Sequence, residues 1–197
     1  MVGESERLIR LVSVLLTLAR AESGRLLRGE PVRVKPIIED VCRQARLLDP
    51  DRTITCAPLL DVAVIGDQDA LKQVLLILMD NALKHTTGTI TVTTTCLDGP
   101  ETRFSGKNLV SNVALSIRDT GPGMDPTVLP HVFERFYRGD EGRGRPGIGL
   151  GLPIAKALVE AQNGTITVES QVEQGSVLTV TLPQASIRRG DSGAVQR

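Results

Sequence analysis

The 197-residue chain is poor in aromatic side chains, which make up 2% of it, and it has no Trp. Surfaces that stack the bases of single-stranded nucleic acid need aromatic rings, so this composition argues against such binding. An excess of charge of one sign is also lacking, because 23 Lys and Arg balance 23 Asp and Glu. This balance disfavours a basic nucleic-acid-binding face and an acidic solvating tail. We therefore expect no nucleic-acid partner and an aliphatic core.

Cysteines and long apolar runs are scarce as well. Cys42, Cys56 and Cys96 lie far apart, are odd in number and lack the spacing of metal ligands, a usage that suits a reducing compartment. No apolar run reaches the roughly 18 to 20 residues that span a bilayer. The nearest approach, residues 8–19, contains Arg10 and follows acidic residues that are not typical of a signal peptide. We expect a soluble, cytoplasmic chain.

The periodicity of the apolar residues predicts an α+β protein. Helices are expected at 4–27, 36–48, 67–85 and 150–162, and strands at 53–56, 62–65, 89–96, 112–118, 165–170 and 176–182. Pro36 suits the first position of its helix, and Asn163-Gly164 suits a left-handed helix end. This order predicts an α/β sandwich, in which helices cover one face of a mixed, mostly antiparallel sheet. The order alone does not determine the topology.

Three further stretches have a distinct character. The apolar stripe of the helix at 4–27 is wider than one neighbour requires, which favours a multi-helix bundle over burial in its own domain. Residues 98–108 form a polar, hairpin-like loop, and residues 185–197 form a polar tail that we expect to be disordered. Residues 124–147 are rich in Gly, Pro and Arg without a long periodic pattern, and a loop of that length is usually functional.

Polar residues near the end of the helix at 67–85 are candidates for binding a metal nucleotide. Asn81 and Lys84 are three residues apart and share a helix face. An amide oxygen can ligate a hard cation such as Mg²⁺, and an ammonium group can meet phosphate. The alternative for this segment alone is a helix that simply ends in polar residues.

Two glycine-containing segments are further candidates. Asp119 ends a predicted strand and is followed by Gly121 and Gly123, which would let a ligand approach the backbone closely, although a tight turn has the same pattern. The run from Gly147 to Gly151 leads into a helix, where backbone N–H groups can meet an anion. This run is neither a Walker loop nor a dinucleotide fingerprint, and by itself it is weak evidence.

Together and in this order, the three segments resemble the N, G1 and G2 boxes of the histidine-kinase branch of the Bergerat-fold ATPases. This superfamily includes gyrase, a heat-shock chaperone and a mismatch-repair protein. Residues 133–138 resemble the F box of sensor kinases, residues 66–75 the usual approach to the N box, and residues 163–166 and 175–183 the closing hairpin. The resemblance covers residues 34–183.

The N-terminal helix adds to the resemblance, because residues 15–24 are similar to the second helix of the dimerisation and phosphotransfer hairpin of these kinases. The resemblance divides the chain into part of that hairpin at 1–30, an ATP-binding catalytic domain at 34–184 and a tail at 185–197. It places the helix with the phospho-accepting His upstream of Met1, since neither His85 nor His131 has such a context. It also implies a possible homodimer through the N-terminal helix.

The resemblance implies a role for each matching residue. Asp119 would accept a hydrogen bond from the adenine amino group, Gly121 and Gly123 would pass close to the base, and residues 124–147 would form the ATP lid. Asn81 would ligate Mg²⁺, Lys84 would contact phosphate, and His85 would lie beside the nucleotide. The remaining contacts implied are Arg138 in the lid, Gly147, Gly149, Leu150 and Gly151 around the phosphates, and Thr179 at the adenine through water.

The implied function is transfer of the γ-phosphate of ATP to a histidine, with a response-regulator receiver domain as partner and most relatives anchored in a membrane. One position departs from the family, because Ile77 stands where the kinases usually have Asn and the wider ATPases often have Glu. A glutamate there activates water, so its absence argues against a gyrase-like or chaperone-like ATPase. The alternatives are a degenerate nucleotide-binding module and a serine kinase acting on an anti-anti-sigma protein.

Overall fold

The computed structural model describes residues 29–57, 59–97, 111–137 and 149–185. The expected N-terminal helix, the loop at 98–108 and the tail after residue 185 lie outside these residues, as do Arg138 and Gly147. Among the described helices, none is long and apolar enough to cross a membrane.

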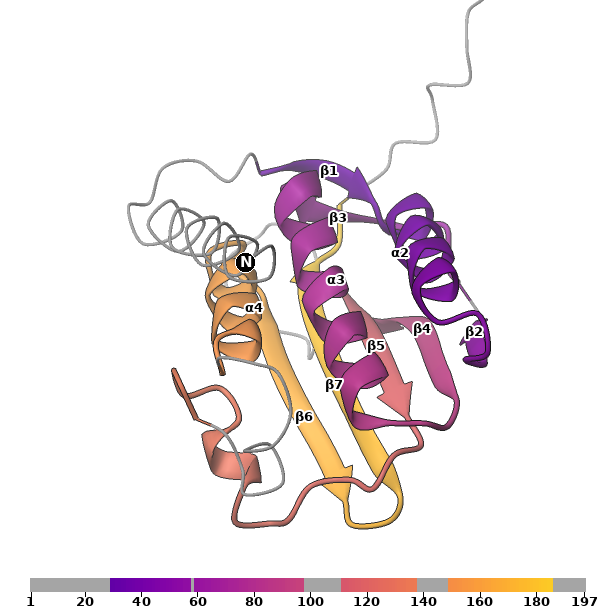
Figure 1. Cartoon of the computed structure of the whole chain (residues 1–197). Coiled ribbons are helices and arrows are strands. Elements are labelled where there is room, and N and C mark those ends of the chain that lie inside the picture. Colours follow the sequence, from indigo (N-terminus) through magenta and orange to yellow (C-terminus); the bar gives the residue numbers. More distant parts are fainter. Residues whose placement is uncertain (1–28, 58, 98–110, 138–148, 186–197) are drawn as a thin grey trace, which may run out of the picture.

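The main sheet has five strands in the spatial order β2-β4-β5-β7-β6 (Figure 1). They are β2 (Ile54–Cys56), β4 (Ile90–Leu97), β5 (Asn112–Asp119), β6 (Thr165–Gln171) and β7 (Gly175–Pro183). In this sheet β2 pairs with β4 in parallel and the other pairs are antiparallel, which confirms the mixed, mostly antiparallel prediction. The strand boundaries lie within one residue of those predicted.

A second, two-stranded sheet was not predicted. β1 (Glu30–Arg33) pairs antiparallel with β3 (Ala63–Gly66), so that Pro31 lies opposite Ile65. Proline is tolerated in such a strand because an edge strand needs no donor on its outer side.

Three helices cover one face of the main sheet (Figure 1). They are α2 (Val34–Leu48), α3 (Gln68–His85) and α4 (Gly151–Glu160), and a short 3₁₀ helix, η1, spans Leu129–His131. Asp67 caps α3, because its Oδ1 accepts hydrogen bonds of 3.0 Å from the N–H groups of Asp69 and Ala70. α2 begins two residues earlier than predicted, so Pro36 is its third residue, where an N–H group would still lack a helical partner.

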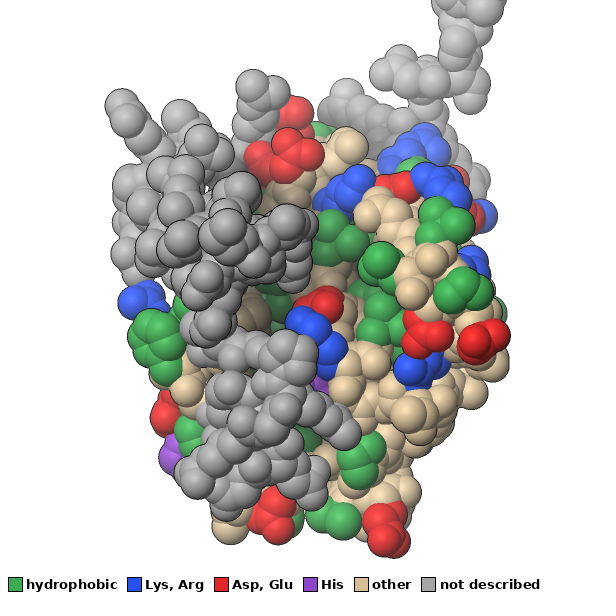
Figure 2. Space-filling view, viewed as in Figure 1, with side chains coloured by type: hydrophobic (Ala, Val, Ile, Leu, Met, Phe, Trp, Pro, Cys, Tyr) green, Lys and Arg blue, Asp and Glu red, His purple; other side chains and the backbone are tan. Residues whose placement is uncertain are grey.

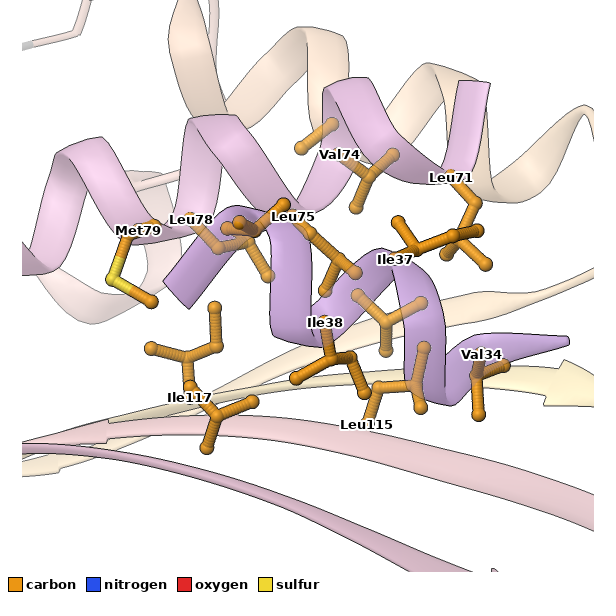
Figure 3. Packing of buried hydrophobic residues seen from close by; sticks show 14 of the residues in the cluster. Val34, Ile37, Ile38, Leu71, Val74, Leu75, Leu78, Met79, Leu115 and Ile117 are labelled. Atoms are coloured by element: carbon orange, nitrogen blue, oxygen red, sulfur yellow. The ribbon is translucent and has the colours of Figure 1, made fainter. Parts of the chain in front are cut away.

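The core lies between this layer of helices and the sheet. On β5, Val113, Leu115 and Ile117 alternate toward the helices and are buried, and Figure 3 shows Leu115 and Ile117 rising toward the side chains of α2 and α3. The helices contribute residues such as Ile38 and Leu78, both fully buried. No aromatic side chain is among the fully buried residues that the structure describes, which confirms the prediction of an aliphatic core.

The domain extends slightly beyond both predicted ends. Glu30, assigned to the helical part, belongs to β1. Ala185, assigned to the tail, is buried, and its N–H donates to the carbonyl of Ala63 at 2.8 Å. This contact and a β-bridge between Val64 and Gln184 join the small sheet to the end of β7. The folded unit therefore includes both strands of the small sheet and Ala185.

Candidate functional site

The inner face of the sheet changes from apolar to polar at one row of residues. In the register of β5, β7 and β6, Ile117 lies opposite Leu178, and the next inner pair along is Asp119 with Ser176. Ser176 in turn lies opposite Ser170 of β6. We call Asp119, Ser176 and Ser170 the polar row. It continues the buried face of the sheet but carries a carboxylate and two hydroxyl groups where the core carries hydrocarbon.

Asp119 is held at the end of β5 by the turn that follows it. The carboxylate is only 6% exposed, and its Oδ1 accepts a hydrogen bond of 2.8 Å from the N–H of Gly121. A Cβ on Gly121 would lie 2.8 Å from that oxygen and 2.9 Å from the carbonyl oxygen of His85. Only glycine lets the chain pass this closely, so the turn presses against the end of α3. Because a carboxylate offers about four acceptor positions, this bond leaves capacity for a ligand donor.

The two serines connect the polar row to the following loop. The hydroxyls of Ser176 and Ser170 lie 2.9 Å apart, and Ser170 Oγ accepts a hydrogen bond of 2.8 Å from the N–H of Met124. Sequence reasoning missed both residues. The signal was available on β7, where Ser176 has the same parity as the inner residues Leu178 and Val180.

Thr179 does not belong to this arrangement. It lies three residues from Ser176 along β7 and therefore points to the opposite face of the sheet. Its hydroxyl is 2.9 Å from that of Ser116, its pairing partner on β5. The structure thus separates Thr179 from Asp119 and places Ser176 opposite Asp119 on the inner face instead.

The end of α3 forms the side of the site next to the Asp119 turn. Lys84 and His85 are exposed there, and Lys84 makes an ion pair with Asp80 one turn earlier. Arg52 donates to the carbonyl of Thr86, just after α3, and is itself held by Asp49 at 2.8 Å. A hollow of about 320 Å³ lies here, and it is lined by Arg52, Leu83, Lys84, His85, Thr86, Thr87, Thr120, Gly121 and Pro122. Over the face seen in Figure 2, acidic and basic side chains are interspersed.

The start of α4 offers backbone donors. Leu150 is its N-cap residue and makes no side-chain capping bond, and the first turn has no acidic residue. The N–H groups at such a helix start lack helical partners and favour an anion. Gly149 precedes them with φ +70°, and a Cβ there would lie 2.7 Å from the carbonyl oxygen of Tyr137. The carbonyl of Gly149 accepts a 2.9 Å hydrogen bond from the N–H of Phe136, so residues 136 and 149 lie side by side.

The described part of the predicted lid, residues 124–137, is anchored to the domain near both of its ends, beginning at Gly123 just before it. Gly123 has φ +72°, and a Cβ on it would lie 2.0 Å from the carbonyl oxygen of Gln171. Thr127 donates hydrogen bonds from its hydroxyl and its backbone to Asp125, which lowers the pKa of that carboxyl. Phe133 packs against the core with Lys156 Nζ 5.7 Å from its ring centre, whereas Phe136 is 67% exposed. Of these two rings, only Phe133 fastens the lid to the domain.

Ile77 lies on α3 and faces the start of α4. It is half-buried against the core, and a Cβ on Gly151 would lie 3.4 Å from its Cγ2. Asn81 follows one turn later on the same face of α3 and is half-buried. Among the described residues, no group of three or more His, Cys, Asp or Glu side chains could hold a metal ion. A metal at this site would therefore need oxygens from its ligand, as Mg²⁺ bound to phosphates has.

The model of the family of histidine kinase-, DNA gyrase B- and HSP90-like ATPases matches residues 66–186 of the chain. The chain belongs to this family. The match includes α3, the Asp119 turn, α4 and the polar row. As a member of this ATPase family, the chain is an ATP-binding domain, and its relatives place it in the histidine-kinase type of that domain.

Sensor histidine kinases are among the relatives of this ATPase domain. The chain is 41% identical over 171 residues to the probable sensor histidine kinase TcrY of Mycobacterium tuberculosis, covering 85% of the chain and 34% of that relative. Among solved structures, the mycobacterial sensor histidine kinase MprB has a TM-score of 0.66 at 28% identity, covering 79% of this chain and 98% of that one. Full-length ShkA, solved in complex with AMPPNP, has a TM-score of 0.75 at 28% identity, covering 93% and 37%. The chain spans about a third of the length of TcrY.

Proposed function

We propose that this ATPase domain binds Mg²⁺–ATP between α3, α4 and the polar row, and passes the γ-phosphoryl group to a histidine on a helical hairpin. The observation that carries the proposal is the buried carboxylate of Asp119, which lies at the end of β5 beside a glycine turn. A buried carboxylate in this setting selects a ligand that donates a hydrogen bond. The amino group of adenine is such a donor, and the carbonyl of guanine is not.

In this proposal different residues contact the base, the phosphates and the lid side of the nucleotide. Asp119 and the hydroxyl of Ser176 meet the base, and Gly121 and Gly123 let the backbone pass along it. The N–H groups at Gly149, Leu150 and Gly151 face the phosphates, to which the start of α4 adds partial positive charge. Lys84 and His85 extend from the end of α3, and Arg138 and Gly147 complete the proposed lid.

Asn81 is the proposed protein ligand of Mg²⁺. The ion would neutralise charge on the transferring phosphoryl group, and the chain's own residues would position the nucleotide for in-line attack. Ile77 offers no ligand one turn before Asn81, so the protein contributes fewer oxygens than the usual kinase pattern. This is the specific observation that favours the second candidate function, a module that binds nucleotide without transferring phosphate.

The proposed partners follow from the kinase type. The acceptor histidine would lie on the first helix of a dimerisation hairpin, with residues 15–24 as part of the second helix, and the chain would pair with a second copy through it. A response-regulator receiver domain would then take the phosphoryl group. We propose a cytoplasmic position for the domain, as the catalytic part of a membrane-bound sensor.

Phosphotransfer to an added hairpin tests the proposal. The chain is incubated with Mg²⁺ and γ-labelled ATP together with a hairpin protein that carries the histidine and both helices. The proposal predicts acid-labile, base-stable label on the hairpin, and Asp119→Ala abolishes it while Thr179→Val does not. Nucleotide binding without label would establish the degenerate module instead, and base-labile label on a serine would establish the serine kinase.

A further inference from the structure

Two cysteines that lie 14 residues apart in the sequence meet at one edge of the domain. Cys42 lies on α2 and Cys56 lies at the end of β2, and these two elements are neighbours (Figure 1). Both thiols are free, Cys42 being fully buried and Cys56 half-buried. Cys56 lies on the same face of β2 as Ile54 and packs against the core cluster that contains Ile54 and Cys42. The pair therefore combines one sulfur that solvent can reach with one that it cannot.

The guanidinium group of Arg46 is held beside the sulfur of Cys56. Arg46 follows Cys42 by one turn of α2 and shares its face. Its Nη2 donates a hydrogen bond of 2.8 Å to the carbonyl of Ile54 and lies 3.7 Å from Cys56 Sγ. A guanidinium held in this way favours negative charge on the sulfur during reaction, and such surroundings are typical of reactive rather than inert cysteines.

The two sulfurs are suited to different steps. Burial, with the hydrogen bond to Cys56 in addition, raises the pKa of the Cys42 thiol to about 12. Cys42 therefore keeps its proton at neutral pH and is shielded from reagents in solution. Cys56 has solvent access and the neighbouring Arg46, so an oxidant would meet Cys56 first and Cys42 would react second.

We propose that Cys42 and Cys56 form a reversible thiol modification site, which a hydroperoxide converts to a disulfide that joins α2 to β2. The Cys56 sulfur attacks one peroxide oxygen, the O–O bond breaks, and the departing hydroxide takes the thiol proton to leave as water. The Cys42 sulfur then attacks the sulfur of the resulting sulfenic acid, the S–O bond breaks, and the second water leaves with the Cys42 proton. Two thiols are oxidised by two electrons, and one hydrogen peroxide is reduced to two waters.

The disulfide would close a ring of the chain that includes Arg52, a residue that contacts the end of α3 beside the proposed nucleotide site. Arg52 lies between the two cysteines in the sequence and donates to the carbonyl of Thr86 at the end of α3. Closing a ring of this size restricts the unfolded chain, so we expect oxidation to raise the thermal midpoint by about 5 °C. This inference does not depend on the proposed kinase function.

The test uses the whole chain, reduced and then freed of reductant, and hydrogen peroxide as the probe. The three thiols of the chain should fall to one, titrated after denaturation, while the protein stays monomeric on a non-reducing gel. Trypsin cuts after Arg43, Arg46 and Arg52, which separates the two cysteines. A Cys42–Cys56 peptide pair that dithiothreitol splits is therefore the expected product.

Single variants supply the controls. Cys96→Ser should still form the link and finish with no free thiol, whereas Cys56→Ser should form none and needs no change in the buried core. Arg46→Gln should slow the loss of thiols several-fold without moving the thermal midpoint of the reduced protein, and Arg46→Lys should restore part of the rate. Arg43→Gln, on an exposed side chain, should leave the rate unchanged. Retention of all three thiols, oxidation of Cys56 without a link, or links made through Cys96 would overturn the proposal.

Discussion

Asp119 and Ser176 lie directly opposite each other in the pairing of β5 with β7, on the face of the sheet that the helices cover. The inner pair next to them, Ile117 with Leu178, belongs to the hydrophobic core. The core and the site are therefore consecutive rows of one surface. This gives the carboxylate a rigid support, because its position is determined by the same register that packs the core.

Ser176 and Thr179 point to opposite faces of β7, which yields a prediction that compares one variant of each. Ser176→Ala should weaken binding of a non-hydrolysable ATP analogue by about fivefold, the value of one hydrogen bond lost in the site. Thr179→Val, three residues away on the outer face, should leave affinity within twofold, which makes it the matched control. Calorimetric titration of both variants measures the difference. If Thr179→Val weakened binding more than Ser176→Ala, the polar row would not be the base-binding surface.

Replacing Ile77 is expected to tighten the binding of a nucleotide with Mg²⁺. Ile77→Asn places an amide oxygen one turn before Asn81, so Mg²⁺-dependent affinity for the analogue should rise several-fold while affinity without Mg²⁺ stays the same. The variant loses apolar packing against the core, so its thermal midpoint should fall slightly. Ile77→Val, which keeps most of this packing and adds no oxygen, is the control. Unchanged affinity of Ile77→Asn in the presence of Mg²⁺ would remove Ile77 from the account of metal binding.

Gly123 and Gly151 differ in what a methyl group would meet. At Gly123 the positive φ and the 2.0 Å approach to Gln171 mean that Ala must displace backbone, so Gly123→Ala should lower the free energy of unfolding by about 2 kcal/mol or more. Gly151→Ala adds a methyl at 3.4 Å from Ile77 in a helix and should be close to neutral. Urea unfolding of the two variants compares them directly. Equal stabilities would contradict the close packing of the Gly123 turn against the β6–β7 hairpin.

The three covering helices and the long strands of the main sheet could be predicted from the sequence because each has a strong period, and the short β2 because its residues favour strands. The amphipathic pattern of α3 and the alternation of β5 and β7 are local signals, and the structure confirms them. β1 could not be found in this way, since four residues containing Pro31 carry no period and the strand depends on β3 as its partner. Local pattern therefore succeeded where an element has a period or is rich in strand-forming residues, as β3 is, and failed where pairing alone defines the strand.

The candidate site shows the same division. Asp119, Gly121 and Gly123 lie within one stretch of five residues, so a motif could identify them, whereas the polar row depends on the register of three strands. The family resemblance implies Thr179, although its position next to Leu178 along β7 already places it on the outer face of the sheet. Cys42 on α2 and Cys56 on β2 come together through the packing of a helix on a strand, and no spacing rule predicts this.

The most direct test of the account is calorimetric binding of a non-hydrolysable ATP analogue, with and without Mg²⁺, to the chain and to Asp119→Ala. The account predicts Mg²⁺-enhanced binding that the substitution abolishes, and much weaker binding of the matching GTP analogue to the unaltered chain. Asp125→Ala, on an exposed carboxylate of the lid, should bind as the parent does. Equal binding by Asp119→Ala, or no preference for adenine over guanine in the folded parent, would contradict the account.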